Sequence, residues 1–136
     1  TIIGTIRTLD YEMQDFINKR MKEMVPDIAK AFRAEATIEI DKGYPITFNH
    51  LELTSQMLPT LQRIASKENV LEIDAITGAE DFSFFQQKIP GLYFFLGGKA
   101  LDVKPEEAAG HHTPDESGFV LGVKTLSALA LDYLEQ

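Results

Sequence analysis

The sequence predicts an α/β fold, in which a β–α–β unit of the α+β kind precedes part of an α/β sheet domain. Three observations support this prediction. An amphipathic helical pattern lies between two strand-like segments in residues 1–41, helical and strand-like segments alternate after residue 50, and 44% of the residues are hydrophobic. That fraction is sufficient for a core and argues against a disordered chain. The 136 residues allow one domain or two small ones.

The first strand, helix and strand are each indicated by a local pattern. Residues 1–9 are rich in Ile and Thr, which favours a strand. Asp10 is the expected N-cap of a helix over 11–33, because apolar residues recur there every three or four positions. Pro26 lies inside that pattern and is expected to kink the helix or to open a fresh turn. Residues 36–41 alternate as a half-buried strand does.

A break in the pattern follows at Lys42-Gly43-Tyr44-Pro45 and predicts a domain boundary near residues 43–49. We therefore expect one domain over 1–45 and a second over 46–136. Ser117 is the expected cap of the last helix. The second domain is predicted to contain helix 51–66, strand 70–73, helix 80–87, strand 92–96, a polar loop over 99–110 and helix 118–135.

The charge and the amino-acid usage exclude several classes of function. The net charge of −8, with 21 acidic and 13 basic residues, argues against binding to nucleic acid or to an anionic membrane surface. We also expect no uninterrupted apolar run of the roughly 18 residues that span a membrane. The chain has no cysteine, which excludes disulfides and cysteine–zinc sites and fits a reducing, cytoplasmic compartment.

Two polar loops contain the candidate site residues. One is Gly110-His111-His112-Thr113-Pro114, and the other is Gly78-Ala79-Glu80-Asp81-Phe82. Neutral imidazole is a common metal ligand, and loops on a rigid scaffold often carry sites, so the two loops suggest part of a metal-dependent hydrolase. Each loop also has a plain structural interpretation. The histidines can be solvated loop residues, and Glu80 and Asp81 can simply stabilise the start of a helix.

Five motifs, taken in order, resemble those of the M20 metallopeptidases, and especially the amidohydrolases that include hippurate hydrolase, aminoacylases and indole-acetyl-amino-acid hydrolases. They are Gly4-Thr5-Ile6-Arg7-Thr8, Gly43-Tyr44-Pro45 with Asn49, Gly78-Ala79-Glu80-Asp81-Phe82, Phe94-Phe95-Leu96-Gly97 and His112-Thr113-Pro114. The resemblance implies a ferredoxin-like lid that often forms homodimers, here over 1–45, and the last part of the catalytic domain after it. It also implies amide hydrolysis of N-acyl amino acids or small peptides at two divalent metals.

The resemblance assigns a role to a few residues. His112 resembles the C-terminal metal ligand, for zinc or for manganese, nickel or cobalt, and the neighbouring His111 does so less well. Arg7 resembles the lid arginine that meets the substrate carboxylate, which suits the planar guanidinium. Asn49 resembles an asparagine near the substrate. Residues Gly78, Glu80 and Asp81 resemble the loop that closes over the metals and contacts the substrate.

The chain departs from the family pattern in two ways. The remaining metal ligands and the glutamate base belong to an N-terminal half of the family that has no counterpart here, so we expect no catalytic residue in this segment and no turnover by it alone. The loop between His112 and Ser117 is also shorter than is usual. We expect the chain to be the C-terminal part of a longer protein. Two alternatives stay open, namely a dimerisation module without chemistry and a domain that binds a small anionic ligand through Arg7.

Overall fold

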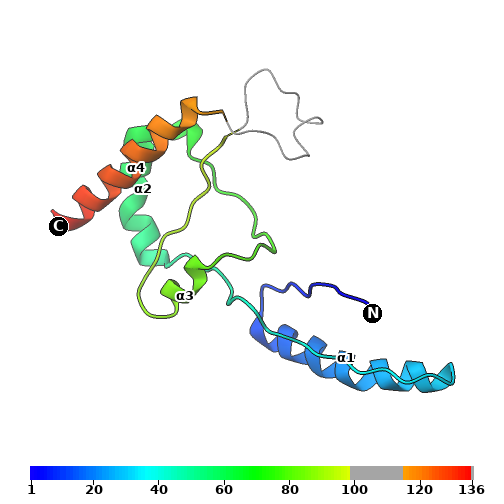
Figure 1. The fold of residues 1–136 in the computed structure, drawn as a ribbon. Helices are drawn as coiled ribbons and strands as arrows, with labels where there is room; N and C mark the ends of the chain where they lie inside the picture. The colour runs from blue at the N-terminus through cyan, green and yellow to red at the C-terminus, as the bar shows by residue number, and fades with distance from the viewer. Residues whose placement is uncertain (99–114, 136) are drawn as a thin grey trace. The chain divides into compact units, whose positions relative to one another are not determined.

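A computed structural model describes residues 1–98 and 115–135 of the chain, and the regular secondary structure in these ranges is helical (Figure 1). The chain divides into two compact units. Unit 1 contains Thr1–Phe48 and Ile73–Ile89, and unit 2 contains Asn49–Glu72 and Pro90–Gln136. The predicted division into 1–45 and 46–136 stays a prediction. The helices are α1 (Tyr11–Ala31), α2 (Leu51–Ala65), the 3₁₀ helix η1 (Lys67–Asn69), α3 (Phe82–Gln86) and α4 (Ser117–Leu134).

Helix α1 begins as the sequence predicts. The Oδ1 atom of Asp10 accepts a hydrogen bond from the backbone N–H of Met13 at 2.7 Å, which makes Asp10 the N-cap. The helix continues through Pro26 as a single element, so the proline does not end it. Pro26 removes one backbone donor from the helix, and the surrounding turns are sufficient to hold the segment.

The C-terminus of α1 is a Schellman motif. The N–H of Arg33 donates to the carbonyl of Lys30, and the N–H of Ala34 donates to the carbonyl of Ala29, both at 2.9 Å. Arg33 therefore lies in the left-handed region, with a φ of 57°. Glycine is the usual residue at this position because a Cβ atom is disfavoured there.

The core of unit 2 lies between α2 and α4, which pack side by side (Figure 1). Met57 and Leu61 of α2 are buried in this contact, and so are the hydroxyl-bearing side chains of Thr60 and Thr125. The Thr60 hydroxyl donates a hydrogen bond to the Asp132 carboxylate, and Arg63 forms an ion pair with the same carboxylate at 2.6 Å. The helix pair is therefore joined by apolar packing and by a polar cluster at one end.

Residues 96–98 lie against small residues of α4. A Cβ atom built on Gly122 would lie 2.9 Å from Cδ2 of Leu96, and one built on Gly118 would lie 3.3 Å from the carbonyl oxygen of Gly97. The backbone N–H of Asp115 also donates to the carbonyl of Gly98 at 2.9 Å. The glycines of α4 therefore allow this segment to approach the helix closely.

The four predicted strands, at 1–9, 36–41, 70–73 and 92–96, are not formed in the part of the chain that the structure describes. Their composition favours extended backbone, but a strand also requires a neighbour that completes the hydrogen-bond ladder. No such ladder is present among the described residues. The structure thus confirms the four predicted helices and contradicts the predicted strands within these ranges, and the ferredoxin-like lid stays a prediction.

Helix α4 corrects one expectation about hydrophobic length. By length and composition alone its 18 residues are apolar enough to cross a membrane. Its chain nevertheless includes Lys124 and Asp132, and the Asp132 carboxylate is bound by Thr60 and Arg63 of α2. We interpret α4 as one member of a packed helix pair, because its charged residue Asp132 binds α2.

Candidate functional site

Unit 1 brings the predicted substrate-binding arginine to the predicted site loop. Nη1 of Arg7 donates a hydrogen bond to the carbonyl oxygen of Thr77 at 3.3 Å, across 70 residues of sequence. Thr77 directly precedes Gly78, and the acidic pair follows within four residues. Arg7 is exposed and forms no ion pair with any described residue. Its guanidinium is therefore placed beside the loop with donors available for an anion.

The acidic pair of this loop is held in a tight turn before α3. Oε1 of Glu80 accepts a hydrogen bond from the backbone N–H of Asp81 at 3.1 Å, and the carbonyl of Glu80 accepts from the hydroxyl of Ser83 at 2.6 Å. Ser83 is fully buried and anchors the turn. The Glu80 side chain raises the pKa of Asp81, first through a hydrogen bond and then through charge repulsion. The two carboxylates therefore lie close enough to interact with each other.

Asn49 belongs to unit 2, where its side chain pairs with the backbone of one residue, Tyr93. Its Nδ2 donates to the carbonyl of Tyr93 at 2.8 Å, and its Oδ1 accepts from the N–H of Tyr93 at 2.7 Å. These contacts fix Asn49 as a structural bridge between the start of α2 and the segment after Pro90. A role in substrate binding stays a prediction for this residue.

His50 is a polar residue at this junction that the sequence analysis did not select. It is the N-cap of α2, with Nδ1 accepting from the N–H of Leu53 at 3.3 Å, and its own N–H donates to the carbonyl of Gly91 at 3.0 Å. Its position directly before an apolar helical pattern could have indicated a cap. The structure thus gives His50 a capping role and brings residues 49–50 next to residues 91–93.

A metal centre is not formed by the described residues themselves. His112, the predicted metal ligand, and His111 lie outside the described residues. Within residues 1–98 and 115–135, no three histidine or acidic side chains gather as a metal site requires. Glu80 and Asp81 are two adjacent donors, which is too few for a site by themselves. We therefore derive no chemical step through a metal from the described part of the chain.

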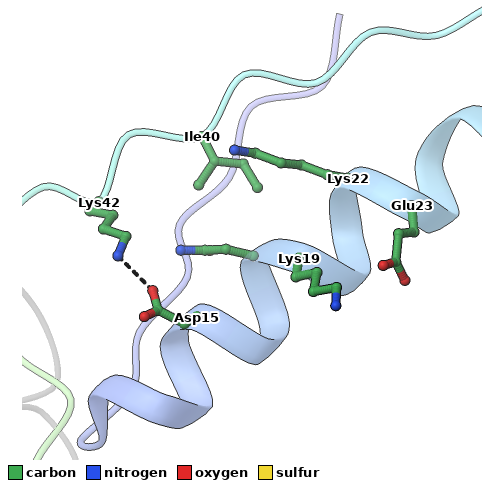
Figure 2. Close-up of a pocket in the computed structure, with 7 residues that line it drawn as sticks. Asp15, Lys19, Lys22, Glu23, Ile40 and Lys42 are labelled. Carbon is green, nitrogen blue, oxygen red and sulfur yellow. Dashed lines mark hydrogen bonds and ion pairs between the residues drawn. The ribbon is translucent and has the colours of Figure 1, made fainter.

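A separate cavity of about 360 Å³ lies in unit 1 between α1 and residues 40–42 (Figure 2). Lys42 and Asp15 form an ion pair across it at 2.5 Å. The Oδ1 atom of Asn18, which is one of the lining residues, is buried and has no hydrogen-bond partner among the described residues. None of the predicted site residues that the structure describes lines this cavity. Its lining residues are Asp15, Asn18, Lys19, Lys22, Glu23, Ile40 and Lys42.

Comparison with known proteins identifies a family for almost the whole chain. The model of Peptidase family M20/M25/M40 matches residues 3–132. No solved structure gives a significant match. The family match therefore covers both units and every predicted site residue.

Individual relatives are hydrolases by name. The chain is 28% identical over 136 residues to the putative amidohydrolase YhaA of Bacillus subtilis, covering 97% of this chain and 34% of the relative. It is 33% identical over 134 residues to N-acetyldiaminopimelate deacetylase of Streptococcus gordonii, covering 96% and 33%. It is 39% identical over 95 residues to thermostable carboxypeptidase 2 of Saccharolobus solfataricus, covering 69% and 23%. The chain thus spans between 23% and 34% of the length of these relatives.

Proposed function

This chain belongs to Peptidase family M20/M25/M40, and on that premise we propose that it is the C-terminal part of a metal-dependent amidohydrolase. The proposed substrates are N-acyl amino acids or small peptides that carry a free carboxylate. The observation that supports this most is the family match over residues 3–132 together with the ordered motifs inside it. The relatives' names, which include an amidohydrolase, a deacetylase and a carboxypeptidase, agree in amide hydrolysis.

The proposed role of Arg7 is to hold the substrate carboxylate. Its position beside Thr77 supports this role, because it places the guanidinium at the loop that carries Glu80 and Asp81. Two parallel N–H groups of a guanidinium match the two oxygens of a carboxylate. The loop residues Gly78, Glu80 and Asp81 would then lie beside the bound substrate.

The proposed metal site uses His112 and donors from the part of the protein that the relatives have and this chain lacks. A divalent metal bound there would polarise the amide carbonyl and supply a nucleophilic water. The metal is zinc in the simplest case, with manganese, nickel and cobalt as alternatives, since one imidazole does not select among them. By this proposal residues 1–136 alone do not turn over substrate.

The activity proposal is tested on the protein expressed from its complete gene, in a cytosol-like reducing buffer. We expect hydrolysis of N-acyl amino acids that stops when a chelator is added and returns with metal. His112→Ala should lower metal occupancy and abolish turnover. Arg7→Ala should raise KM about 10- to 100-fold, as expected for a lost charge-assisted contact, while Arg20→Ala, an exposed arginine of α1, should not. Binding of substrate without any metal requirement would favour the anionic-ligand carrier instead.

We also propose a homodimer through residues 1–45. Apolar side chains of α1, among them Met13, Phe16 and Ile28, are half or more exposed, and such a face commonly marks an interface. Light scattering of the protein tests this, with Phe16→Glu expected to convert the dimer to a monomer. A protein that is dimeric but neither binds metal nor hydrolyses amides would support the dimerisation module.

A further inference from the structure

The cavity between α1 and residues 40–42 has the size and the charge of a site for a small anion. Its volume of about 360 Å³ lies within the range of about 300–1,000 Å³ that small-molecule sites occupy. Its lining includes Lys19, Lys22 and Lys42 and no arginine. Lys22 extends from α1 towards residues 40–42, and Lys42 extends back towards α1 (Figure 2). On a chain with a net charge of −8, these lysines form a local cationic group.

The two acidic side chains in the lining are already paired with cations. Asp15 forms an ion pair with Lys42 at 2.5 Å. Glu23 forms one at 2.7 Å with Arg20 of the same helix. The other two lysines of the lining form no ion pair with any residue that the structure describes. The charge available to a ligand in the cavity is therefore positive and comes from these two ammonium groups.

Asn18 adds a buried polar atom without a partner to the same lining. The residue is only 8% exposed, and its Oδ1 atom accepts no hydrogen bond within the part of the chain that the structure describes. A buried acceptor that lacks a partner is costly, and such atoms commonly bind a water molecule or a ligand. Because Asn18 lines the cavity, a molecule in the cavity can supply the missing partner. An acceptor requires a donor, so that molecule carries an O–H or N–H group.

These features together define the chemistry of the ligand. An ammonium group binds phosphate as a point charge, and a lining without arginine offers no planar fork for a carboxylate. We propose that this cavity binds a small phosphate-bearing molecule, with its anionic oxygens on Lys19 and Lys22 and an O–H group on Oδ1 of Asn18. Arg7 does not line the cavity, so the site is distinct from the one that we propose for the substrate carboxylate.

Two kinds of phosphate compound meet both requirements. Inorganic phosphate is anionic near neutral pH and still keeps a P–OH group, which can donate to Asn18. A phosphate ester of a polyol, such as glycerol 3-phosphate, has its anionic group at one end and hydroxyl groups at the other. Sulfate has a similar size and charge but is fully deprotonated at this pH, so it has no O–H group to donate. Comparison with sulfate therefore separates recognition by Asn18 from simple attraction to lysine.

The test measures binding to the protein expressed from its complete gene, after a chelator has removed any metal that could hold the anion. Isothermal titration calorimetry compares inorganic phosphate, glycerol 3-phosphate and sulfate at neutral pH and constant ionic strength. We expect at least one phosphate compound to bind about tenfold more tightly than sulfate. Lys22→Ala should weaken that binding about tenfold. Lys30→Ala is the matched control, because Lys30 is an exposed lysine of α1 that does not line the cavity, and it should leave the affinity unchanged.

Asn18→Asp tests the buried acceptor, because it keeps the shape of the side chain and adds a negative charge. It should abolish binding of phosphate, and its melting temperature shows whether the variant is folded. Lys22→Glu repels the anion from an exposed position and gives the same test if Asn18→Asp does not fold. Tighter binding of glycerol 3-phosphate than of inorganic phosphate identifies the ester as the ligand, and the reverse order identifies the free ion.

Three results would overturn the inference. They are equal affinities for phosphate and sulfate, a phosphate affinity that the changes at positions 18 and 22 leave unaltered, and no binding of either phosphate compound. None of these measurements uses hydrolysis of an amide. The inference therefore stands or falls separately from the proposed function.

Discussion

The side-chain amide of Asn49 and the backbone N–H and carbonyl of Tyr93 form a reciprocal pair of hydrogen bonds, at 2.8 and 2.7 Å. An asparagine amide carries a donor and an acceptor on two neighbouring atoms, so it can bond the N–H and the carbonyl of one residue together. The pair joins the start of α2 to a segment more than 40 residues later in the chain. It gives Asn49 a structural role in addition to the role in substrate binding that its motif predicts.

We therefore expect Asn49→Ala to destabilise the protein by about 1–3 kcal/mol, because two partly buried backbone groups of Tyr93 lose their partner. Denaturant unfolding measures this loss. Asn69→Ala is the control, since Asn69 makes a single exposed hydrogen bond to the carbonyl of Ala65 and should cost less. An Asn49 that only contacted substrate would leave the free energy of unfolding unchanged when it is replaced.

The helices were predictable from the sequence because their signals are local. The predicted helix 11–33 corresponds to α1 and its predicted cap, Asp10, is the observed one. The predicted last helix corresponds to α4, but its predicted cap, Ser117, is wrong. Ser117 is the first helical residue, and its N–H donates to Oδ1 of Asp115. An apolar repeat fixes a helix within a few residues, whereas the choice among adjacent capping residues depends on the exact path of the loop.

The strands and the site contacts depend on partners that are distant in the sequence. Residues 1–9 have a strand composition, but no described neighbour completes a ladder with them. The same limit applies to Arg7, whose motif suggested a role but not that it would lie at Thr77, 70 residues later. Phe84 and Phe85 are apolar by composition, and the structure leaves both more than half exposed. Composition predicts that a side chain is apolar, and only the fold decides whether it is covered.

The left-handed conformation of Arg33 gives a prediction about stability. Arg33→Gly should raise the free energy of unfolding by about 0.5–1 kcal/mol, since glycine adopts a φ of 57° without the Cβ penalty and this gain exceeds its entropic cost. Thermal unfolding measures the change. Arg33→Ala removes the same charge but keeps the Cβ atom, so it should give no increase. Equal stabilisation by both variants would show that charge, and not backbone conformation, is responsible.

The cluster around Asp132 makes stability depend on pH. The hydroxyl of Thr60, and then the guanidinium of Arg63, lower the pKa of Asp132 below its ordinary value of 3.8. A depressed pKa in the folded state contributes stability that is present above 3.8 and is lost as the pH falls through the folded pKa. Thr60→Val should therefore raise the pKa of Asp132 and weaken the fall in melting temperature below pH 3.8.

The control for that variant is Thr54→Val in the same helix. The Thr54 hydroxyl donates to the carbonyl of His50 and has no contact with Asp132, so its loss should leave the acid limb of the stability profile unchanged. An identical acid limb in the wild type and in Thr60→Val would remove the hydroxyl as the cause of the shift.

The acidic pair predicts a shift in the opposite direction. The Glu80 carboxylate raises the pKa of Asp81, so the folded chain takes up a proton more readily than the unfolded chain just above the ordinary pKa of 3.8. Stability linked to this group therefore falls as the pH rises through that window. Glu80→Ala removes both the hydrogen bond and the charge, and should return the pKa of Asp81 towards 3.8 in a carboxyl NMR titration.

Glu80→Gln separates the two causes, because it keeps a hydrogen-bonding side chain but removes the charge. We expect it to give a pKa of Asp81 between those of the wild type and Glu80→Ala, since the hydrogen bond is the larger cause. Glu72→Gln, outside the site loop, serves as the control. If the pKa of Asp81 does not change with any substitution at position 80, the two carboxylates do not interact as we propose.

The close approach of residues 96–98 to α4 can be tested by a double-mutant cycle at Gly122 and Leu96. A glycine in the middle of a helix costs about 1 kcal/mol relative to alanine, so Gly122→Ala would stabilise α4 if nothing opposed it. The new Cβ atom would lie 2.9 Å from Cδ2 of Leu96, which forces that side chain to move. Gly122→Ala should therefore stabilise the Leu96→Ala background by about 1 kcal/mol and the wild type by less. If Gly122→Ala stabilises both backgrounds equally, the close contact with Leu96 does not contribute to the free energy of unfolding.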